Sequence, residues 1–340
     1  MSSTYKAHEQ QGILLNANEN PENLSSEILD EIAQALKQTA FNRYPEDGAF
    51  KLRQAYADWL GVNASQVLAG NGSDQMLQVA IQTFIQPGDI LMTLDPDFGM
   101  YDFYCSQAKG IMEKFAVCKD GSFDLDAFIE RAKKVQPSLV LFSNPNNPSG
   151  NLITKEQVRK LAQALPNTPV IMDEAYMEFA QDSALELIGQ LDNLYLTRTL
   201  SKMFGLAAMR VGFLISTPEN IAVLDGHRPV YNLSTPAQVI GTILLGHAKE
   251  YEAKRDAIVA ERLRMEKELA ALEGITLHPS AANFICLYPQ DPADLAGALK
   301  EEGIQIRSYP NKDYVRITVG SREQNDQVLD VIRRMQKESL

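Results

Sequence analysis

The chain has 340 residues, of which 45% are hydrophobic and 22% are charged, a balance typical of a globular protein with one large and one smaller domain. Its formal net charge is −12 and it has no long basic run, which argues against nucleic acid or an anionic membrane as a partner. It shows no signal-peptide core and no apolar stretch long enough to cross a bilayer, so we expect a soluble, cytoplasmic protein.

The cysteines and histidines indicate which disulfides, metal sites and proton-transfer groups the chain can form. Cys105, Cys118 and Cys286 are widely spaced and form no CxxC pair, which indicates free thiols in a reducing compartment. The four histidines are too far apart in the sequence to form a local metal site, and we expect no metal. Proton transfer would therefore use Lys, Tyr, Asp or Glu.

Short apolar runs alternate with longer amphipathic segments from about residue 48 to 220. The predicted strands are 66–70, 89–94, 138–143, 169–173, 193–198 and 211–215. The predicted helices between them are 73–85, 100–108, 125–134 and 154–165. Near-continuous apolar strands joined by helices predict an α/β fold, with a mostly parallel sheet sandwiched by helices.

The pattern changes after residue 234. A Ser-Thr-Pro start signal opens one long helix or two abutting helices, and strands at 283–288, 304–308 and 314–320 follow, with helices around 292–302 and 321–337. We therefore predict a large domain at 35–230 and a smaller α+β domain formed by 1–34 plus 231–340.

Ligands of open α/β sheets bind at the carboxyl ends of the strands, so the residues after each predicted strand matter most. Gly72, Ser73 and Asp74 follow the first strand and begin a helix, which is typical of an anion cradle but equally of an ordinary N-cap. The string "NPNNPSG" follows 138–143, where Asn147 would offer an amide to the cleft unless the string is a plain turn.

Two further strand ends carry ionisable groups. Asp173 and Tyr176 follow 169–172, and a plain capping role for Asp173 stays open. An ATPase reading of this strand fails because the chain has no GxxxxGK[ST] motif. The stretch "TLSKMFGLAAMRVGF" follows 193–198 and places Lys202 between apolar runs, where an ammonium is costly to bury.

Together these strand ends supply the groups that pyridoxal phosphate requires. Its aldehyde needs a lysine amine, and its pyridine nitrogen needs a carboxylate. Its ring oxygen needs hydrogen-bond donors, and its phosphate needs a helix N-terminus and a guanidinium.

The chain resembles the histidinol-phosphate aminotransferase family, which uses the fold-type-I, aspartate-aminotransferase-like architecture with a seven-stranded sheet. The resemblance is carried along almost the full length by "LNANENP", "NRYPE", "FGMY", "NPNNPSG", "DEAYMEF", "RTLSKMFGLAAMRVGF", "YNLS" and "VRITVG".

The resemblance implies pyridoxal 5'-phosphate as the cofactor. It implies that Lys202 forms the Schiff base and shuttles the proton, that Asp173 pairs with the pyridine nitrogen, and that Tyr176 and Asn147 bond the ring oxygen. The implied phosphate ligands are Gly72, Ser73, Asp74, Thr199, Ser201 and Arg210, with Tyr44 contributed by the neighbouring subunit of a homodimer. Phe98 is expected to stack on the ring, in place of a Tyr found in many relatives.

The implied reaction is ping-pong transamination in histidine biosynthesis, from histidinol phosphate to 2-oxoglutarate. Arg316 and Arg307 match the residues that hold the substrate's anionic group, and Asn20 lies where the substrate side chain is read. Aromatic amino-acid transamination and threonine-phosphate decarboxylation stay open, because related families share this framework. A pyridoxal-phosphate-binding module without catalysis is the least favoured alternative.

Overall fold

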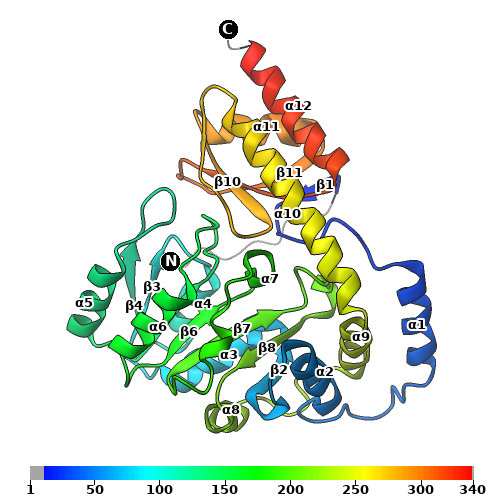
Figure 1. Ribbon diagram of the computed structural model, residues 1–340, viewed down its shortest axis with the longest axis vertical. Coiled ribbons are helices and arrows are strands. Elements are labelled where there is room, and N and C mark those ends of the chain that lie inside the picture. The colour runs from blue at the N-terminus through cyan, green and yellow to red at the C-terminus, as the bar shows by residue number, and fades with distance from the viewer. Residues whose placement is uncertain (1–10, 339–340) are drawn as a thin grey trace.

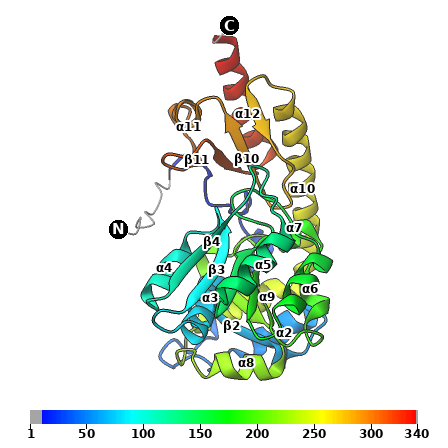
Figure 2. The ribbon, with the colours of Figure 1, turned by 90° about the vertical axis from the view of Figure 1, so that its left-hand side faces the viewer.

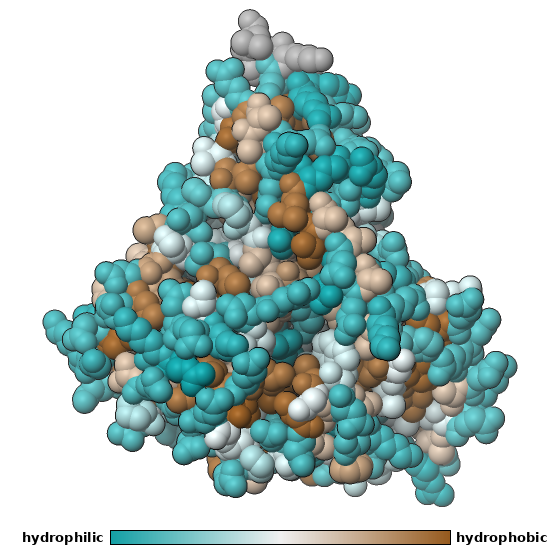
Figure 3. All heavy atoms as spheres, viewed as in Figure 1, coloured by the Kyte–Doolittle hydropathy of each residue, from teal (hydrophilic) through white to brown (hydrophobic). Residues whose placement is uncertain are grey.

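The computed structural model describes residues 11–338, and within that range the strands form one sheet of seven strands and one of five. Figure 1 shows the larger sheet and its helices in the lower part of the molecule and the smaller sheet above, with helix α10 (Ala248–Ala270) running between the two parts. Figure 3 shows hydrophilic side chains over much of the visible face, with smaller hydrophobic patches between them. No helix among residues 11–338 is both long enough and apolar enough to cross a membrane.

The larger sheet has the strand order β2-β8-β7-β6-β5-β3-β4, and only β8 runs against the others. Its strands are β2 (Val67–Asn71), β3 (Ile90–Asp95), β4 (Ile111–Ala116), β5 (Leu139–Ser143), β6 (Val170–Asp173), β7 (Leu194–Thr199) and β8 (Val211–Ile215). The mostly parallel, helix-covered sheet expected from the sequence is confirmed. Strand β4 was not predicted, because this edge strand is half-exposed and its sequence "IMEKFA" is not a continuous apolar run.

Helices cover both faces of this sheet, as Figure 2 shows. Helices α3 (Gly72–Phe84), α4 (Met100–Gln107) and α8 (Pro218–Asp225) pack on one face. Helices α2 (Phe50–Leu60), α5 (Leu125–Val135), α6 (Lys155–Ala164) and α9 (Thr235–Gly246) pack on the other. On β5, Leu139 and Leu141 join the first layer, whereas Val140 and Phe142 join the second. A strand buried on both faces must be apolar at every position, which is why these strands are continuous hydrophobic runs.

The smaller sheet has the order β1-β11-β12-β10-β9. Its strands are β1 (Ile13–Leu15), β9 (Ile275–Leu277), β10 (Phe284–Pro289), β11 (Ile304–Ser308) and β12 (Val315–Thr318), with helices α11 (Pro292–Glu301) and α12 (Arg322–Glu338). Strand β1 pairs in parallel with β11, Ile13 opposite Ile304, so the N-terminal segment crosses to the C-terminal part of the fold.

The segment after residue 234 forms two abutting helices, α9 and α10, which meet at His247. Helix α9 lies against the larger sheet, where a Cβ on Gly241 would come within 2.8 Å of Leu52 on α2. The division into 35–230 and 1–34 plus 231–340 stays a prediction. The remaining elements are α1 (Ser26–Lys37), α7 (Met177–Ala180) and the 3-10 helices η1 (Ala64–Gln66), η2 (Ala184–Leu187) and η3 (Ala207–Met209).

Candidate active site

Most of the residues expected to bind the cofactor lie at one edge of the larger sheet. Strands β5, β6 and β7 are parallel and in register there, so Ser143, Asp173 and Thr197 form a cross-strand row. Strand β8 is antiparallel to them, which brings its first residues to the same edge as their last. The topology therefore gathers the residues that follow β2, β5, β6 and β7 and the residue that precedes β8.

Asp173 is a buried carboxyl, 4% exposed, at the end of β6. Its Oδ1 accepts a hydrogen bond of 2.7 Å from the Thr197 hydroxyl, and its Oδ2 accepts one of 2.8 Å from the Tyr101 hydroxyl. Burial raises the pKa of Asp173 to about 6, although these two hydrogen bonds oppose the rise. The group is thus fixed in orientation and able to share a proton near neutral pH.

Lys202 lies in the turn that follows β7, and its Nζ donates a 2.9 Å hydrogen bond to the carbonyl oxygen of Ala17. The same Nζ lies 5.7 Å from the centroid of the Tyr176 ring. Burial lowers the pKa of Lys202 to about 8, and the positive charge of Arg316 contributes to the shift. At neutral pH, a lysine with this pKa has a far larger fraction in the neutral, nucleophilic form than a surface lysine has.

Tyr176 and Asn147 lie side by side beneath the N-terminal segment. The Tyr176 hydroxyl accepts hydrogen bonds from Nδ2 of Asn18 at 3.0 Å and from Nδ2 of Asn147 at 3.5 Å. Asn18 is 1% exposed and is itself held by Thr318 on β12, whose hydroxyl accepts the Asn18 backbone N–H at 2.9 Å. The smaller sheet, through Thr318, therefore helps to fix Asn18, which donates a hydrogen bond to Tyr176.

Arg316 links the two sheets. Its Nη1 donates to Oδ1 of Asn147 at 2.7 Å, its Nη2 donates to the carbonyl oxygen of Asn16 at 2.7 Å, and its buried Nε has no hydrogen-bond partner. Arg307 on β11 stands directly opposite Arg316 on β12. Two like charges opposite each other on paired strands are unfavourable, so this pair is suited to an anion between or beside the guanidinium groups.

The expected anion cradle lies at the start of helix α3. No side chain caps this helix, so the backbone N–H groups of Gly72, Ser73 and Asp74 stay available at its N-terminus. Arg210, just before β8, donates a 2.6 Å hydrogen bond to Asp74, and a Cβ on Gly72 would lie 2.7 Å from its Nη2. The glycine thus makes room for the guanidinium.

Two hydroxyls lie behind Arg210. The Thr199 hydroxyl donates to the Ser201 hydroxyl at 2.9 Å and accepts the backbone N–H of Ser201 at 3.0 Å. Ser201 Oγ accepts a 3.5 Å hydrogen bond from Nη1 of Arg210. Both hydroxyl residues are buried, and Ser201 stands between Thr199 and the guanidinium.

Three other expected residues have distinct surroundings. Phe98 packs edge-on against Tyr101, with ring centroids 5.6 Å apart. Nδ2 of Asn20 donates to the carbonyl oxygen of Met203 at 2.9 Å, next to Lys202. Tyr44 is 81% exposed and stacks on Tyr231 at 4.8 Å, so it lies on the surface and outside the site of its own chain.

The sequence reading missed Tyr101, Thr197 and Asn18. Tyr101 stands in "FGMY" and Asn18 in "LNANENP", two strings of the family resemblance that do not by themselves mark these residues. Thr197 could have been found from strand pairing, since it lies directly opposite Asp173. Asn18 was out of reach, because its hydrogen bonds to Tyr176 and Thr318 depend on tertiary structure.

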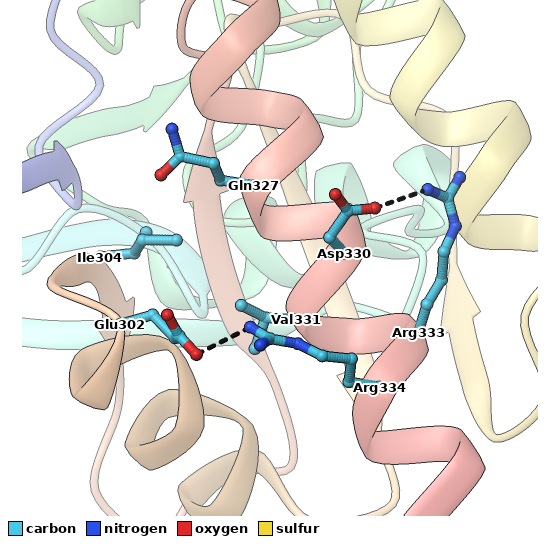
Figure 4. A pocket seen from close by; sticks show the side chains of 7 residues that line it. All are labelled: Glu302, Ile304, Gln327, Asp330, Val331, Arg333 and Arg334. Carbon is cyan, nitrogen blue, oxygen red and sulfur yellow. Dashed lines mark hydrogen bonds and ion pairs between the residues drawn. The ribbon is translucent and has the colours of Figure 1, made fainter.

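A separate hollow of about 440 Å³ lies between α11, β11 and α12, and none of the expected site residues lines it. Figure 4 shows that its arginines are already paired, Arg334 with Glu302 and Arg333 with Asp330. It offers no free cation for an anionic ligand. Within residues 11–338, no group of three or more His, Cys, Asp or Glu side chains could hold a metal ion.

Comparison with known proteins gives consistent matches. Residues 10–332 match the family model described as aminotransferase class I and II. The chain is 36% identical to the histidinol-phosphate aminotransferase of Clostridium novyi over 324 residues, 94% of this chain and 91% of that relative. It is 33% identical to the enzyme of the same name from Chlorobaculum tepidum, over 98% of this chain and 97% of that one.

A solved structure agrees with these relatives. The histidinol-phosphate aminotransferase of Sinorhizobium meliloti, in complex with pyridoxal-5'-phosphate, superposes with a TM-score of 0.86 at 26% identity. The match covers 96% of this chain and 92% of that one.

Proposed function

This chain belongs to the aminotransferase class I and II family, and from that membership we propose that it transfers the amino group of histidinol phosphate to 2-oxoglutarate. The observation that carries the proposal is the position of Asn147, which contacts both Tyr176 on the cofactor side and Arg316 on the substrate side. One amide thereby couples the expected cofactor groups to the expected anion ligand.

The residues present fit pyridoxal phosphate. Asp173 is a buried carboxyl able to hold a proton, Lys202 is a lysine of lowered pKa, and the start of α3 is uncapped beside Arg210. Asp173 would hold the pyridine nitrogen, and Asn147 and Tyr176 the ring oxygen. The phosphate would be held by Arg210, Ser201 and the N–H groups at the start of α3.

When bound, pyridoxal phosphate supplies an aldehyde for the amine and an electron-withdrawing ring that acidifies the substrate's Cα–H bond. Lys202, as the neutral amine, would move a proton from the donor's Cα to C4′ of the cofactor in the first half-reaction and from C4′ to the acceptor's Cα in the second. Asp173 would stabilise positive charge on the pyridine nitrogen, because Tyr101 and Thr197 keep both carboxylate oxygens aligned.

The substrate preference follows from the smaller sheet. Arg316 and Arg307 would bind the phosphate of histidinol phosphate in one half-reaction and a carboxylate of 2-oxoglutarate or glutamate in the other. Tyr309 lies beneath the Arg307 guanidinium at 5.4 Å and packs on Tyr314 at 5.0 Å. Tyr309 is part-exposed and would offer an aromatic surface for an imidazole beside the anion site, with the buried Tyr314 behind it.

The same aromatic surface favours a second candidate, an aromatic amino-acid aminotransferase. Tyr288 extends the cluster, with its ring 5.7 Å from that of Tyr314. In an aromatic amino acid, a carboxylate takes the place of the phosphate ester that histidinol phosphate carries at the end opposite its imidazole. The paired arginines favour the more highly charged phosphate donor.

A half-reaction experiment decides between the two. Protein loaded with pyridoxal phosphate is mixed in turn with histidinol phosphate, phenylalanine and tyrosine, and loss of the lysine-bound cofactor's absorbance is followed. We expect conversion to be fastest with histidinol phosphate, and Arg316→Gln to raise the KM for it at least tenfold. Faster conversion by the aromatic amino acids would overturn the proposed donor.

Assembly and location complete the proposal. A homodimer is supported by exposed apolar residues in two chain segments, namely Phe41, Tyr44, Phe50, Val230 and Tyr231. In such a dimer Tyr44 would reach the cofactor phosphate of the neighbouring subunit. A cytoplasmic location is supported by the free thiols of Cys105, Cys118 and Cys286.

A further inference from the structure

Asp97 stands at the start of a chain of hydrogen bonds that ends at Arg316. It lies in the loop after β3, and its carboxylate faces Ser143 at the end of β5. Its Oδ2 accepts the backbone N–H of Ser143 at 3.1 Å, and its Oδ1 accepts both the Ser143 hydroxyl and the backbone N–H of Phe98. Three donors thus converge on one carboxylate.

The Ser143 hydroxyl connects Asp97 to the backbone of Asn147. A serine hydroxyl has one proton, and here it points at Asp97, so the lone pairs of the oxygen face the other way. There Oγ accepts the backbone N–H of Asn147 at 2.9 Å. Ser143 is 2% exposed, so water cannot readily replace either bond.

Asn147 is the next member of the chain. With its backbone held by Ser143, its Oδ1 accepts the 2.7 Å hydrogen bond from Arg316, and its Nδ2 faces the Tyr176 hydroxyl. The peptide group fixed by Ser143 therefore sets the position of the amide that Arg316 contacts.

An ionised Asp97 lowers the stability of the fold, because it is desolvated and lies near another carboxylate. Burial and the nearby charge of Asp173 raise the pKa of Asp97, whereas the three hydrogen bonds lower it by favouring the ionised carboxylate that accepts them. A second carboxyl within the electrostatic influence of Asp173 is unfavourable by itself. Its contribution must come from the donors it holds in place.

We propose that Asp97 is a positioning residue that, through Ser143 and Asn147, orients Arg316 toward the anionic group of the substrate. The inference rests on the proposed function, since it takes Arg316 as the anion ligand. Asparagine at position 97 has one acceptor oxygen and one donor group for three converging donors. Whichever way this amide is turned, at least one donor of Ser143 then faces the amide NH2 group, so Ser143 must shift and its bond to Asn147 is weakened.

The test measures anion binding apart from turnover. Protein loaded with pyridoxal phosphate is titrated with glutarate, a dicarboxylate that has no amino or keto group to react, and Kd is measured by calorimetry. Donor KM and kcat are measured on the same samples. The variants are Asp97→Asn, Ser143→Ala, their double variant and Arg316→Gln. Asp102→Asn is the matched control, because Asp102 is a half-exposed aspartate that pairs with Lys114 at 2.9 Å.

We expect Asp97→Asn and Ser143→Ala each to raise the glutarate Kd and the donor KM about tenfold, with kcat changed less than about threefold. The double variant should be no worse than the poorer single variant, since both break one chain. Cofactor affinity should change less than glutarate affinity, because Tyr176 and Asp173 also hold the cofactor ring, and the thermal midpoint should match that of Asp102→Asn. If Asp97→Asn does not fold, Ser143→Ala decides by the same readouts.

Two results overturn the inference and leave the proposed function standing. One is an unchanged Kd and KM in Asp97→Asn while Arg316→Gln raises both. The other is a loss of cofactor affinity as large as the loss of glutarate affinity, which would make Asp97 a structural residue only. An unchanged Kd in Arg316→Gln would instead reject the anion site of the proposed function, and the role of Asp97 with it.

Discussion

The surroundings of Lys202 disfavour the positive charge on its amine, and this lowers the free energy of unfolding by a measurable amount. Its pKa is about 8 in the folded protein and 10.5 when unperturbed, so between these values the unfolded chain holds a proton that the folded chain lacks. Stability therefore rises with pH across this window, and the full cost is present below about pH 8. Lys202→Met should raise the free energy of unfolding of the cofactor-free protein at pH 7 by roughly 1–3 kcal/mol.

Urea unfolding at pH 7 and pH 9.5 measures this cost. The difference between Lys202→Met and the parent should shrink at the higher pH, where the folded amine is already neutral. Lys249→Met, at an exposed lysine, should change stability by less than about 0.5 kcal/mol at either pH. A Lys202→Met variant no more stable than the parent at pH 7 would contradict the buried, destabilised amine.

Asp173 is the second residue whose ionisation matters. In Asp173→Asn the amide cannot balance a positive charge on the pyridine nitrogen, although it keeps nearly the same shape between Thr197 and Tyr101. We expect turnover to fall about 10²–10⁴-fold and the cofactor to dissociate faster. Single-turnover absorbance and cofactor dialysis measure the two effects, with the exposed Asp192→Asn as the control. Turnover within threefold of the parent would argue against the assigned role.

The proposed phosphate-binding site at the start of α3 depends on how closely strand β8 approaches this helix. A Cβ on Gly212 of β8 would lie 2.0 Å from the backbone nitrogen of Ser73, so only glycine allows the start of α3 to sit against the strand. Gly212→Ala should displace that helix terminus and weaken pyridoxal-phosphate binding about tenfold or more.

Fluorescence titration of the cofactor-free protein with pyridoxal phosphate measures the change. Gly246→Ala is the control, because a Cβ there meets no atom within 4 Å. Equal affinities for the two variants would show that the close approach of β8 and α3 does not shape the phosphate site.

The whole molecule is proposed to be a homodimer with shared sites, and mixing two inactive variants tests this. Lys202→Met removes the amine from its own site, and Tyr44→Ser removes the ring expected at the partner's phosphate. A mixed dimer of the two then contains one site with both residues intact. We expect each variant alone to be impaired, and the mixture, after co-refolding, to recover up to about a quarter of the parent activity per subunit.

Simple statistics set that figure: half of randomly formed dimers are mixed, and each has one complete site of two. Sedimentation of each variant confirms that dimers form. A mixture no more active than its components, in samples shown to be dimeric, would place Tyr44 outside the shared site.

The sequence by itself determined the fold class and most elements, because strands buried on both faces must be continuously apolar and amphipathic helices must alternate. Strand β8 was predicted at its observed bounds, and β2, β3, β5, β6 and β7 within one residue. Lys202, Asp173 and Asn147 were predicted as site residues because each lies at or just after the carboxyl end of a strand that meets the same sheet edge. The edge strand β4 was missed because it lacks a buried second face.

Tertiary structure alone decided the contacts between distant segments. The pairing of Ile13 with Ile304, the hydrogen bond from Lys202 to Ala17 and the chain from Asp97 through Ser143 join residues with no shared periodicity. Local patterns record which face of an element is buried, but not which partner covers it. The lowered pKa of Lys202 depends on those partners, since burial and the charge of Arg316 come from elements that meet only in the folded chain.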